Sequence, residues 1–189
     1  MLTPGNRGAP GATGRPDGRA TARKDGGVHE LQLRPMTPDE FGAFRSRLIR
    51  DYAAEHVRAG NWSAEESEAL AAEQTDQLLP RGVNTPRVLM LMAETPEGEP
   101  VGHVWVALER RPGSGGGAWI YDIEVAPDRR GQGYGRVLLR AAEDETARRG
   151  VTAIGLNVFG GNAVARQLYE TSGYDVTTLQ MRKELRPPG

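Results

Sequence analysis

The stretch Ile120-Tyr-Asp-Ile-Glu-Val-Ala-Pro-Asp-Arg-Arg-Gly-Gln-Gly-Tyr-Gly135 decides the fold of this chain. Its apolar beginning predicts a buried strand, after which a glycine-rich loop opens a helix. Glycines let successive backbone amides converge on one point, and the helix N-terminus adds a partial positive charge. The segment therefore predicts a cradle for a diphosphate, to which the flanking Arg130 and Arg136 can add charge.

Two common nucleotide-binding motifs do not fit this loop. A P-loop ends in Gly-Lys-Ser/Thr, whereas Gly135 is followed by Arg136 and Val137. A dinucleotide fingerprint has the spacing Gly-x-Gly-x-x-Gly near the start of a βαβ unit. This loop has the spacing Gly-x-Gly-x-Gly and comes late in the chain, so neither motif explains it.

The rest of the chain shows strand and helix patterns in turn. Thr37-Pro-Asp-Glu40 and Ser63-Ala-Glu-Glu66 are capping boxes, which predict two helices that end near Gly60 and Pro80. We expect strands over 29–34, 88–94, 100–108, 119–125, 151–158 and 174–185, a flexible loop over 113–117, and further helices over 133–149 and 162–171. This order predicts a mixed α/β domain around one central sheet.

Two sequence blocks carry a resemblance to a known family. The loop Arg130-Gly-Gln-Gly-Tyr-Gly135 resembles the coenzyme A loop, Arg/Gln-x-x-Gly-x-Gly/Ala, of the GCN5-related N-acetyltransferase (GNAT) superfamily. The block Leu156 to Tyr174 is similar to the strand and helix that follow in that superfamily, with matching positions at Asn162, Ala165, Tyr169, Gly173 and Tyr174. The spacing between the blocks fits as well, and the resemblance covers His29 to Leu185.

The resemblance implies a mostly antiparallel α/β sheet of about six to seven strands, flanked by helices and splayed in the middle for acetyl-CoA. It implies that the backbone of Ile123 to Val125 bonds the pantetheine arm. The diphosphate is then expected on Arg130, Gly131, Gln132, Gly133, Tyr134, Gly135 and Arg136. Asn162 is expected to cap its helix and to contact the pantetheine.

The chemistry of acetyl transfer suggests two catalytic residues. An alkyl amine has a pKa of about 10.4 and must lose a proton before it attacks. Glu124 is the leading base, on a strand face expected to be shared with Asp122 and opposite to Tyr121 and Ile123; a structural ion pair is the alternative. Tyr169 stands where the family keeps a tyrosine that protonates the leaving sulfur; the alternative is an aromatic side chain that packs its helix on the sheet. Asn157 replaces a glutamate found in some relatives, which leaves Glu124 or water as the base.

The acceptor site is less defined by the sequence. In relatives the region of Tyr52, His56 and Trp62 lines the acceptor cleft, so these residues are expected to bind substrate. The alternative is that Tyr52 is a core residue and His56 a solvated helix end. His103 is expected to be a structural histidine.

Length and composition limit the remaining possibilities. The chain has 189 residues, a net charge of −1 and no cysteine, which fits one domain and offers no field for nucleic acid or membrane. Residues 1–27, rich in glycine, proline and arginine, are expected to be a flexible tail before a domain over 28–186. The chain lacks an apolar signal segment or membrane span, which predicts a cytoplasmic protein, and three scattered histidines predict no metal site.

These observations predict an acetyl-CoA-dependent N-acetyltransferase that acts directly on a primary amine of a small molecule or a protein N-terminus. The absence of cysteine argues against a covalent acyl-enzyme. The alternative is a non-catalytic acyl-CoA sensor or scaffold of the same fold, which Asn157 keeps open. A homodimer is compatible with the sequence, although no segment demands one.

Overall fold

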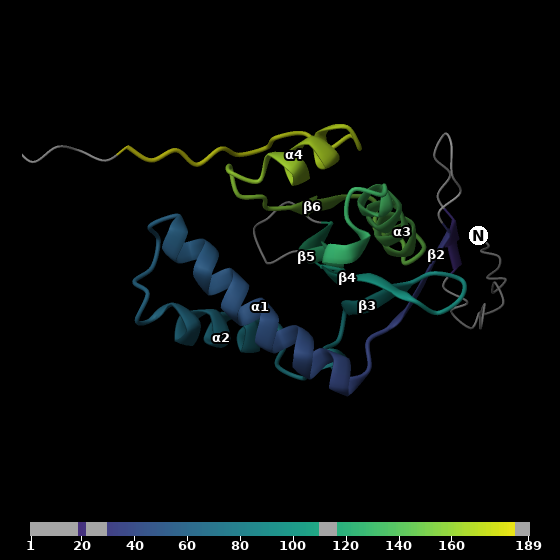
Figure 1. Cartoon of the computed structure of the whole chain (residues 1–189), viewed down its shortest axis with the longest axis horizontal. Coiled ribbons are helices and arrows are strands. Elements are labelled where there is room, and N and C mark those ends of the chain that lie inside the picture. Colours follow the sequence, from purple (N-terminus) through teal and green to yellow (C-terminus); the bar gives the residue numbers. More distant parts are fainter. Residues whose placement is uncertain (1–18, 22–29, 110–116, 184–189) are drawn as a thin grey trace, which may run out of the picture.

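A computed structural model describes residues 19–21, 30–109 and 117–183. These residues form one mixed sheet with the order β1-β2-β3-β4-β5-β6, in which each pair is antiparallel except the parallel pair β5–β6 (Figure 1). The strands are β1 (Arg19–Thr21), β2 (Glu30–Pro35), β3 (Val88–Glu94), β4 (Pro100–Ala107), β5 (Ala118–Val125) and β6 (Ile154–Leu156). The helices are α1 (Pro38–Arg58), α2 (Ser67–Leu78), α3 (Tyr134–Ala147) and α4 (Ala163–Glu170), with short 3-10 turns η1 (Gly82–Asn84) and η2 (Pro127–Arg129).

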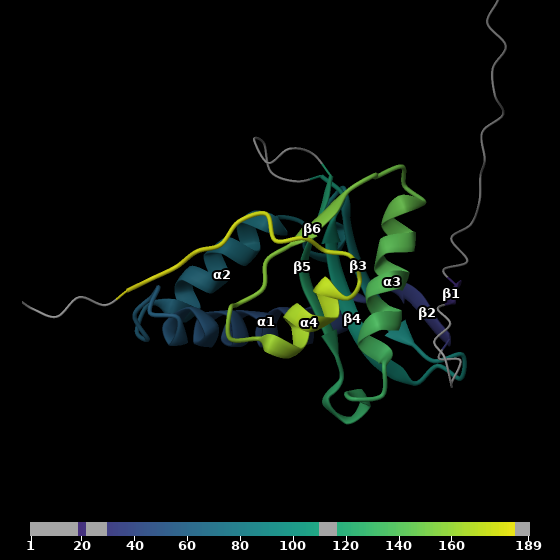
Figure 2. The ribbon, with the colours of Figure 1, turned by 90° about the horizontal axis from the view of Figure 1, so that it is seen from above.

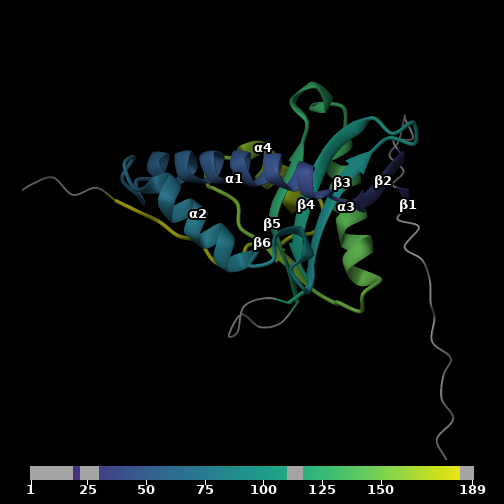
Figure 3. The same ribbon diagram turned by 90° about the horizontal axis from the view of Figure 1, so that it is seen from below.

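Helices cover both faces of the sheet. Helices α1 and α2 lie on one side and α3 on the other, as the views from above and from below show (Figure 2, Figure 3). The alternation of strand side chains produces both cores: Leu89 and Leu91 pack on the α3 side, whereas Met90 packs with Phe44 and Trp105 on the α1 side. The α/β architecture expected from the sequence is therefore confirmed.

Local capping explains where α1 begins, but it does not fix the start of α2. Thr37 and Glu40 form the reciprocal capping box of α1. Of the second box only one half is present, since Ser63 Oγ accepts from the Glu66 amide at 3.3 Å, while the Glu66 carboxylate accepts from the Ser63 hydroxyl at 2.9 Å. Residues 64–66 form a turn, however, and regular helical bonding begins with the Leu70 amide donating to the Glu66 carbonyl. Helix α2 therefore starts at Ser67, later than the box alone predicts.

The sheet opens between its last two strands. Parallel pairing joins Ala118 to Ile154 and ends at Ile120 with Leu156, whereas β5 continues to Val125. The strand expected over 151–158 is thus only three residues long. The expected splay of these two strands is present in the structure.

The C-terminal strand prediction is wrong for the described residues. Residues 174–183 form no strand, and the apolar side chains of Val176, Leu179 and Met181 are largely exposed. Their spacing does not keep a period of two, so a strand here would have no continuous apolar face to bury. Arg182 instead donates to the carbonyl of Gly60 at 2.6 Å, beyond the end of α1.

Some expectations concern residues outside the described part of the chain. The predicted tail 1–27 is described only at β1, which pairs with β2, and most of the predicted loop 113–117 is likewise outside. None of the helices in the described ranges combines the length and the apolar character that crossing a membrane requires.

Candidate active site

The open edge of β5 presents backbone groups toward the gap left by β6. The Ala126 amide donates to the Val101 carbonyl at 2.8 Å, so Val125 and Gly102 form the neighbouring pair without mutual hydrogen bonds. By alternation, the amide and carbonyl groups of Val125 and Ile123 point away from β4. These are the residues expected to bond an extended ligand arm, and their backbone has the required direction.

The glycine loop carries free amide donors at the start of α3. Gly131 and Gly133 have positive φ angles of 74° and 91°, and Gly133 is the N-cap residue of the helix. Within the described residues, the amides of Gly131, Gln132 and Gly133 form no hydrogen bond. Unpaired donors at the N-terminus of a 14-residue helix fit the diphosphate of coenzyme A.

The loop side chains hold the loop in place. Arg130 donates to the Val125 carbonyl at 3.0 Å and to Glu124 at 2.7 Å, and Arg136 donates to Thr171 Oγ1 at 2.7 Å. Gln132 donates to the carbonyl of Asp128 at 3.0 Å. Tyr134 is buried, and a Cβ on Gly135 would lie 3.4 Å from Leu168. The arginines expected on phosphate therefore have protein partners in this structure, whereas the amides do not.

A β-bulge changes which side chains of β5 share a face. The register of β4 and β5 shifts between Trp105 and Val106. As a result Tyr121 stacks on Trp105, with ring centroids 4.6 Å apart, on the same face as Asp122. The expectation that Tyr121 and Asp122 point to opposite faces is wrong, because a bulge puts two successive residues opposite one.

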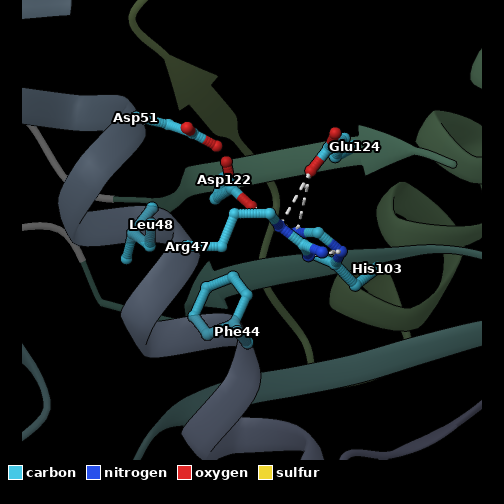
Figure 4. A pocket seen from close by; sticks show the side chains of 7 residues that line it. All are labelled: Phe44, Arg47, Leu48, Asp51, His103, Asp122 and Glu124. Carbon is cyan, nitrogen blue, oxygen red and sulfur yellow. Dashed lines mark hydrogen bonds and ion pairs between the residues drawn. The ribbon is translucent and has the colours of Figure 1, made fainter. Parts of the chain in front are cut away.

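Asp122 and Glu124 line a recess between β5 and α1, which we call the acidic recess (Figure 4). His103 Nε2 lies 2.6 Å from Asp122 Oδ2, and Arg47 Nη2 lies 3.3 Å from His103 Nδ1. The Arg47 guanidinium is also 3.5 Å from Glu124. The recess is lined by Phe44, Arg47, Leu48, Asp51, His103, Asp122 and Glu124.

Sequence reasoning missed the α1 side of this recess. Phe44, Arg47, Leu48 and Asp51 recur at helical spacing, so one face of α1 presents all four to β5. That spacing was the available signal, but the pairing of Arg47 with a histidine 56 positions later comes only from the fold.

Tyr169, on α4, lies on the opposite side of the sheet from the acidic recess. It packs, with Leu168 and Tyr174, against the core on the α3 side. Burial, and secondarily the charge of Asp122, raise the pKa of the Tyr169 hydroxyl above its usual value. A tyrosine in this state stays protonated at neutral pH and can act as a proton donor.

The other expected ligand contact, Asn162, caps α4. Its side chain accepts from the Ala165 amide at 3.1 Å, as the sequence predicts for a helix cap. Asn157 is exposed and follows the last residue of β6. It thus lies just beyond the last residue of β6 that pairs with β5.

The three expected acceptor residues lie together at the end of α1. His56 stacks on Trp62 with ring centroids 3.8 Å apart, and Tyr52 meets His56 edge-on at 4.4 Å. Phe159, from the loop between β6 and α4, lies edge-on to His56 at 5.9 Å. Burial lowers the pKa of His56 below its ordinary value, which favours the neutral ring.

Comparisons with known proteins agree with this geometry. Residues 45–174 match the Acetyltransferase (GNAT) family. The uncharacterized N-acetyltransferase YycN of Bacillus subtilis is 33% identical over 156 residues, which cover 82% of this chain and 99% of YycN. The crystal structure of YycN superposes with a TM-score of 0.77 at 32% identity and covers 83% of this chain and 99% of that one.

Two further relatives have more specific names. The mycothiol acetyltransferase of Kytococcus sedentarius is 30% identical over 152 residues, 80% of this chain and 48% of the relative. The [ribosomal protein bS18]-alanine N-acetyltransferase of Escherichia coli K12 is 41% identical over 63 residues, 33% of this chain and 43% of the relative.

Proposed function

Because the chain belongs to the GNAT acetyltransferase family, we propose that it transfers the acetyl group of acetyl-CoA to a primary amine. The acceptor class is a small molecule or a protein N-terminus. The observation that carries the proposal is the position of the open β5 edge. This edge leads to the loop of unpaired amides, its carboxylates line the acidic recess on one face, and Tyr169 packs on the other face.

The coenzyme is expected to bind along this edge. The backbone groups of Ile123 and the amide of Val125 can bond an extended arm in the way a missing strand would, whereas the Val125 carbonyl already accepts from Arg130. The amides of Gly131, Gln132 and Gly133 would hold the diphosphate at the start of α3. When bound, acetyl-CoA supplies an acyl group activated as a thioester.

Residues on the two faces of the gap would divide the proton transfers. The acceptor arrives as an ammonium ion and must lose a proton, and the carboxylates of β5 lie on the recess side to take it. Tyr169, whose raised pKa keeps it protonated, would donate to the departing sulfur. Direct transfer needs one group to accept the proton of the amine and another to protonate the sulfur. The proposed base and acid would supply these two steps from opposite sides of the sheet opening.

The aromatic cluster of Tyr52, His56 and Trp62 is proposed to line the entrance for the acceptor. Phe159 adds an apolar side chain that is 37% exposed. The related bS18-alanine and mycothiol acetyltransferases support an amine acceptor without choosing between a protein and a small molecule.

Two measurements test the proposal. Isothermal titration calorimetry with CoA should show binding, and thiol release from acetyl-CoA should rise when amines from a panel of N-terminal peptides and small amines are added. Absence of CoA binding would refute the proposal. Binding without turnover on any amine would indicate an acyl-CoA sensor instead.

A further inference from the structure

Glu124 is poorly placed to be the base, because both of its carboxylate oxygens face guanidinium groups. Arg130 Nη2 lies 2.7 Å from Oε1, and Arg47 Nε lies 3.5 Å from Oε2. Arginine stays charged at any working pH and can only donate, so both oxygens of Glu124 are engaged by cationic donors. A proton arriving on Glu124 would have to disrupt this arrangement, and the release of Arg130 would also free the end of β5.

Asp122, two residues earlier, has a different environment. Its Oδ2 meets His103 Nε2 at 2.6 Å, and within the described residues no hydrogen bond reaches its other oxygen. The Asp122 side chain is 28% exposed, whereas that of His103 is only 6% exposed. Asp122 therefore offers one oxygen to the recess while a buried partner holds the other.

Arg47 decides the tautomer of His103. A guanidinium can only donate, so Nδ1, 3.3 Å from Arg47 Nη2, must be the acceptor nitrogen. The proton of the neutral ring then lies on Nε2 and is donated to Asp122. Phe44 packs edge-on against the ring at 5.0 Å and restricts its orientation. Arg47 thus donates a hydrogen bond to His103, and His103 donates one to Asp122.

The charge of Asp122 also acts on Tyr169, which packs on the other face of the sheet. Asp51 extends from α1 toward Asp122 in the recess (Figure 4). A cationic acceptor that enters the recess would meet two carboxylates there.

We propose that Asp122, positioned by His103, takes the proton from the acceptor ammonium, and that Glu124 anchors Arg130 instead. This inference depends on the proposed acetyltransferase function. An N–H bond of the ammonium breaks and an O–H bond forms on Asp122, which leaves the electron pair on nitrogen. That pair forms the bond to the acyl carbon while the C–S bond breaks.

The remaining protons balance through Tyr169. The departing sulfur takes the tyrosine proton, and the phenolate recovers one from the nitrogen as the amide forms. Asp122 returns its proton to solvent through the recess. The acceptor thus loses two protons, one of which ends on the thiol and one in solution.

Kinetics of matched variants separate the two carboxylates. Asp122→Asn should lower kcat at least about 100-fold at saturating substrates with unchanged CoA affinity, as expected for loss of a general base. Glu124→Gln should lower kcat less than tenfold and should raise the KM for acetyl-CoA, because Arg130 loses its partner. The control Asp76→Asn makes the same change at a remote carboxylate that pairs with Arg45 and should stay within twofold.

His103 is tested by rescue and by its NMR signature. His103→Leu removes the donor to Asp122 and should lower kcat roughly 10- to 100-fold through misplacement of the carboxylate. His103→Gln keeps an N–H near the Nε2 position and should recover much of that loss. Long-range ¹H–¹⁵N spectra of the wild-type protein should show the ring proton on Nε2, and Arg47→Leu should weaken that preference.

The outcomes distinguish this inference from the proposed function. If wild-type protein turns over and Asp122→Asn keeps a third or more of its kcat, the inference fails and the proposed function stands. A ring proton on Nδ1 would overturn the role of His103. If wild-type protein binds CoA but acetylates no amine, the proposed function fails and this inference with it.

Discussion

Replacement of Gly133 by alanine tests whether the loop amides bind the diphosphate. Gly133 has φ 91° and ψ −7°, a left-handed conformation that an L residue adopts at a cost of about 1–2 kcal/mol. A Cβ at this position meets nothing within 4 Å, so collision with neighbours adds nothing to that cost. The free-energy cost of Gly133→Ala then comes entirely from the backbone conformation.

This conformational cost should weaken the binding of CoA to Gly133→Ala. The free loop of Gly133→Ala relaxes out of the left-handed region, and CoA binding must restore it. A cost of about 1–2 kcal/mol corresponds to a CoA dissociation constant roughly 5- to 30-fold weaker, which calorimetry resolves. The unfolding temperature should change little, because the relaxed loop is not strained.

Gly42 provides a matched control. It lies inside α1, its Cβ would also meet nothing within 4 Å, and its φ is not positive. Gly42→Ala should therefore stabilise the protein by about 0.5–1 kcal/mol and leave CoA affinity unchanged. If Gly133→Ala binds CoA within twofold of wild type, the loop does not act through its backbone conformation, and the assignment of the diphosphate site is refuted.

Three further variants probe the acid, an ion pair and the core. Tyr169→Phe should lower kcat about 100-fold without weakening CoA binding, and in the wild type the raised pKa should keep any alkaline loss of rate above pH 10. Arg34 lowers the pKa of Glu40 to about 2, so this pair stabilises the fold above pH 4.5 and is lost as the pH falls toward 2. In urea titrations, the free energy of unfolding of Glu40→Gln should fall less steeply than that of the wild type as the pH is lowered from 4.5 to 2. At pH 7 the variant should be less stable by about 1 kcal/mol or less. Leu138→Ala, at a fully buried position of α3, should lower the free energy of unfolding by about 2–5 kcal/mol.

Features that depend on local chemistry were predictable from the sequence. The capping box of Thr37 and Glu40, the cap at Asn162 and the glycine loop before α3 all occur where predicted. Each depends on backbone donors and conformations within a few residues, which the sequence lists directly. The order of strands and helices from β2 to α4 follows from the same kind of signal.

Features that depend on partners far along the chain were not predictable. The bulge at Trp105 is set by how β4 and β5 pair, so the face of Tyr121 was assigned wrongly. The contact of Arg47 with His103 spans 56 positions, and Arg130 turns back to Glu124 instead of facing the loop amides. A single sequence gives residue types, but register and long-range ion pairs need the assembled sheet.

The position of the site follows from the way β5 is held. Among the described residues, β4 is the only strand that pairs with the last residues of β5, and a Cβ at Gly102 would collide with the Glu124 carbonyl, so the two strands approach closely there. Backbone hydrogen bonds to β4, such as that from the Ala126 amide to the Val101 carbonyl, hold this end of β5 without support from β6. The free side of the strand can then accept a ligand backbone, while its alternating side chains reach the acidic recess on one face and the α3 core on the other. A strand bonded on both sides has no free backbone groups to bind an extended arm, so the early end of β6 is what makes this strand a binding edge.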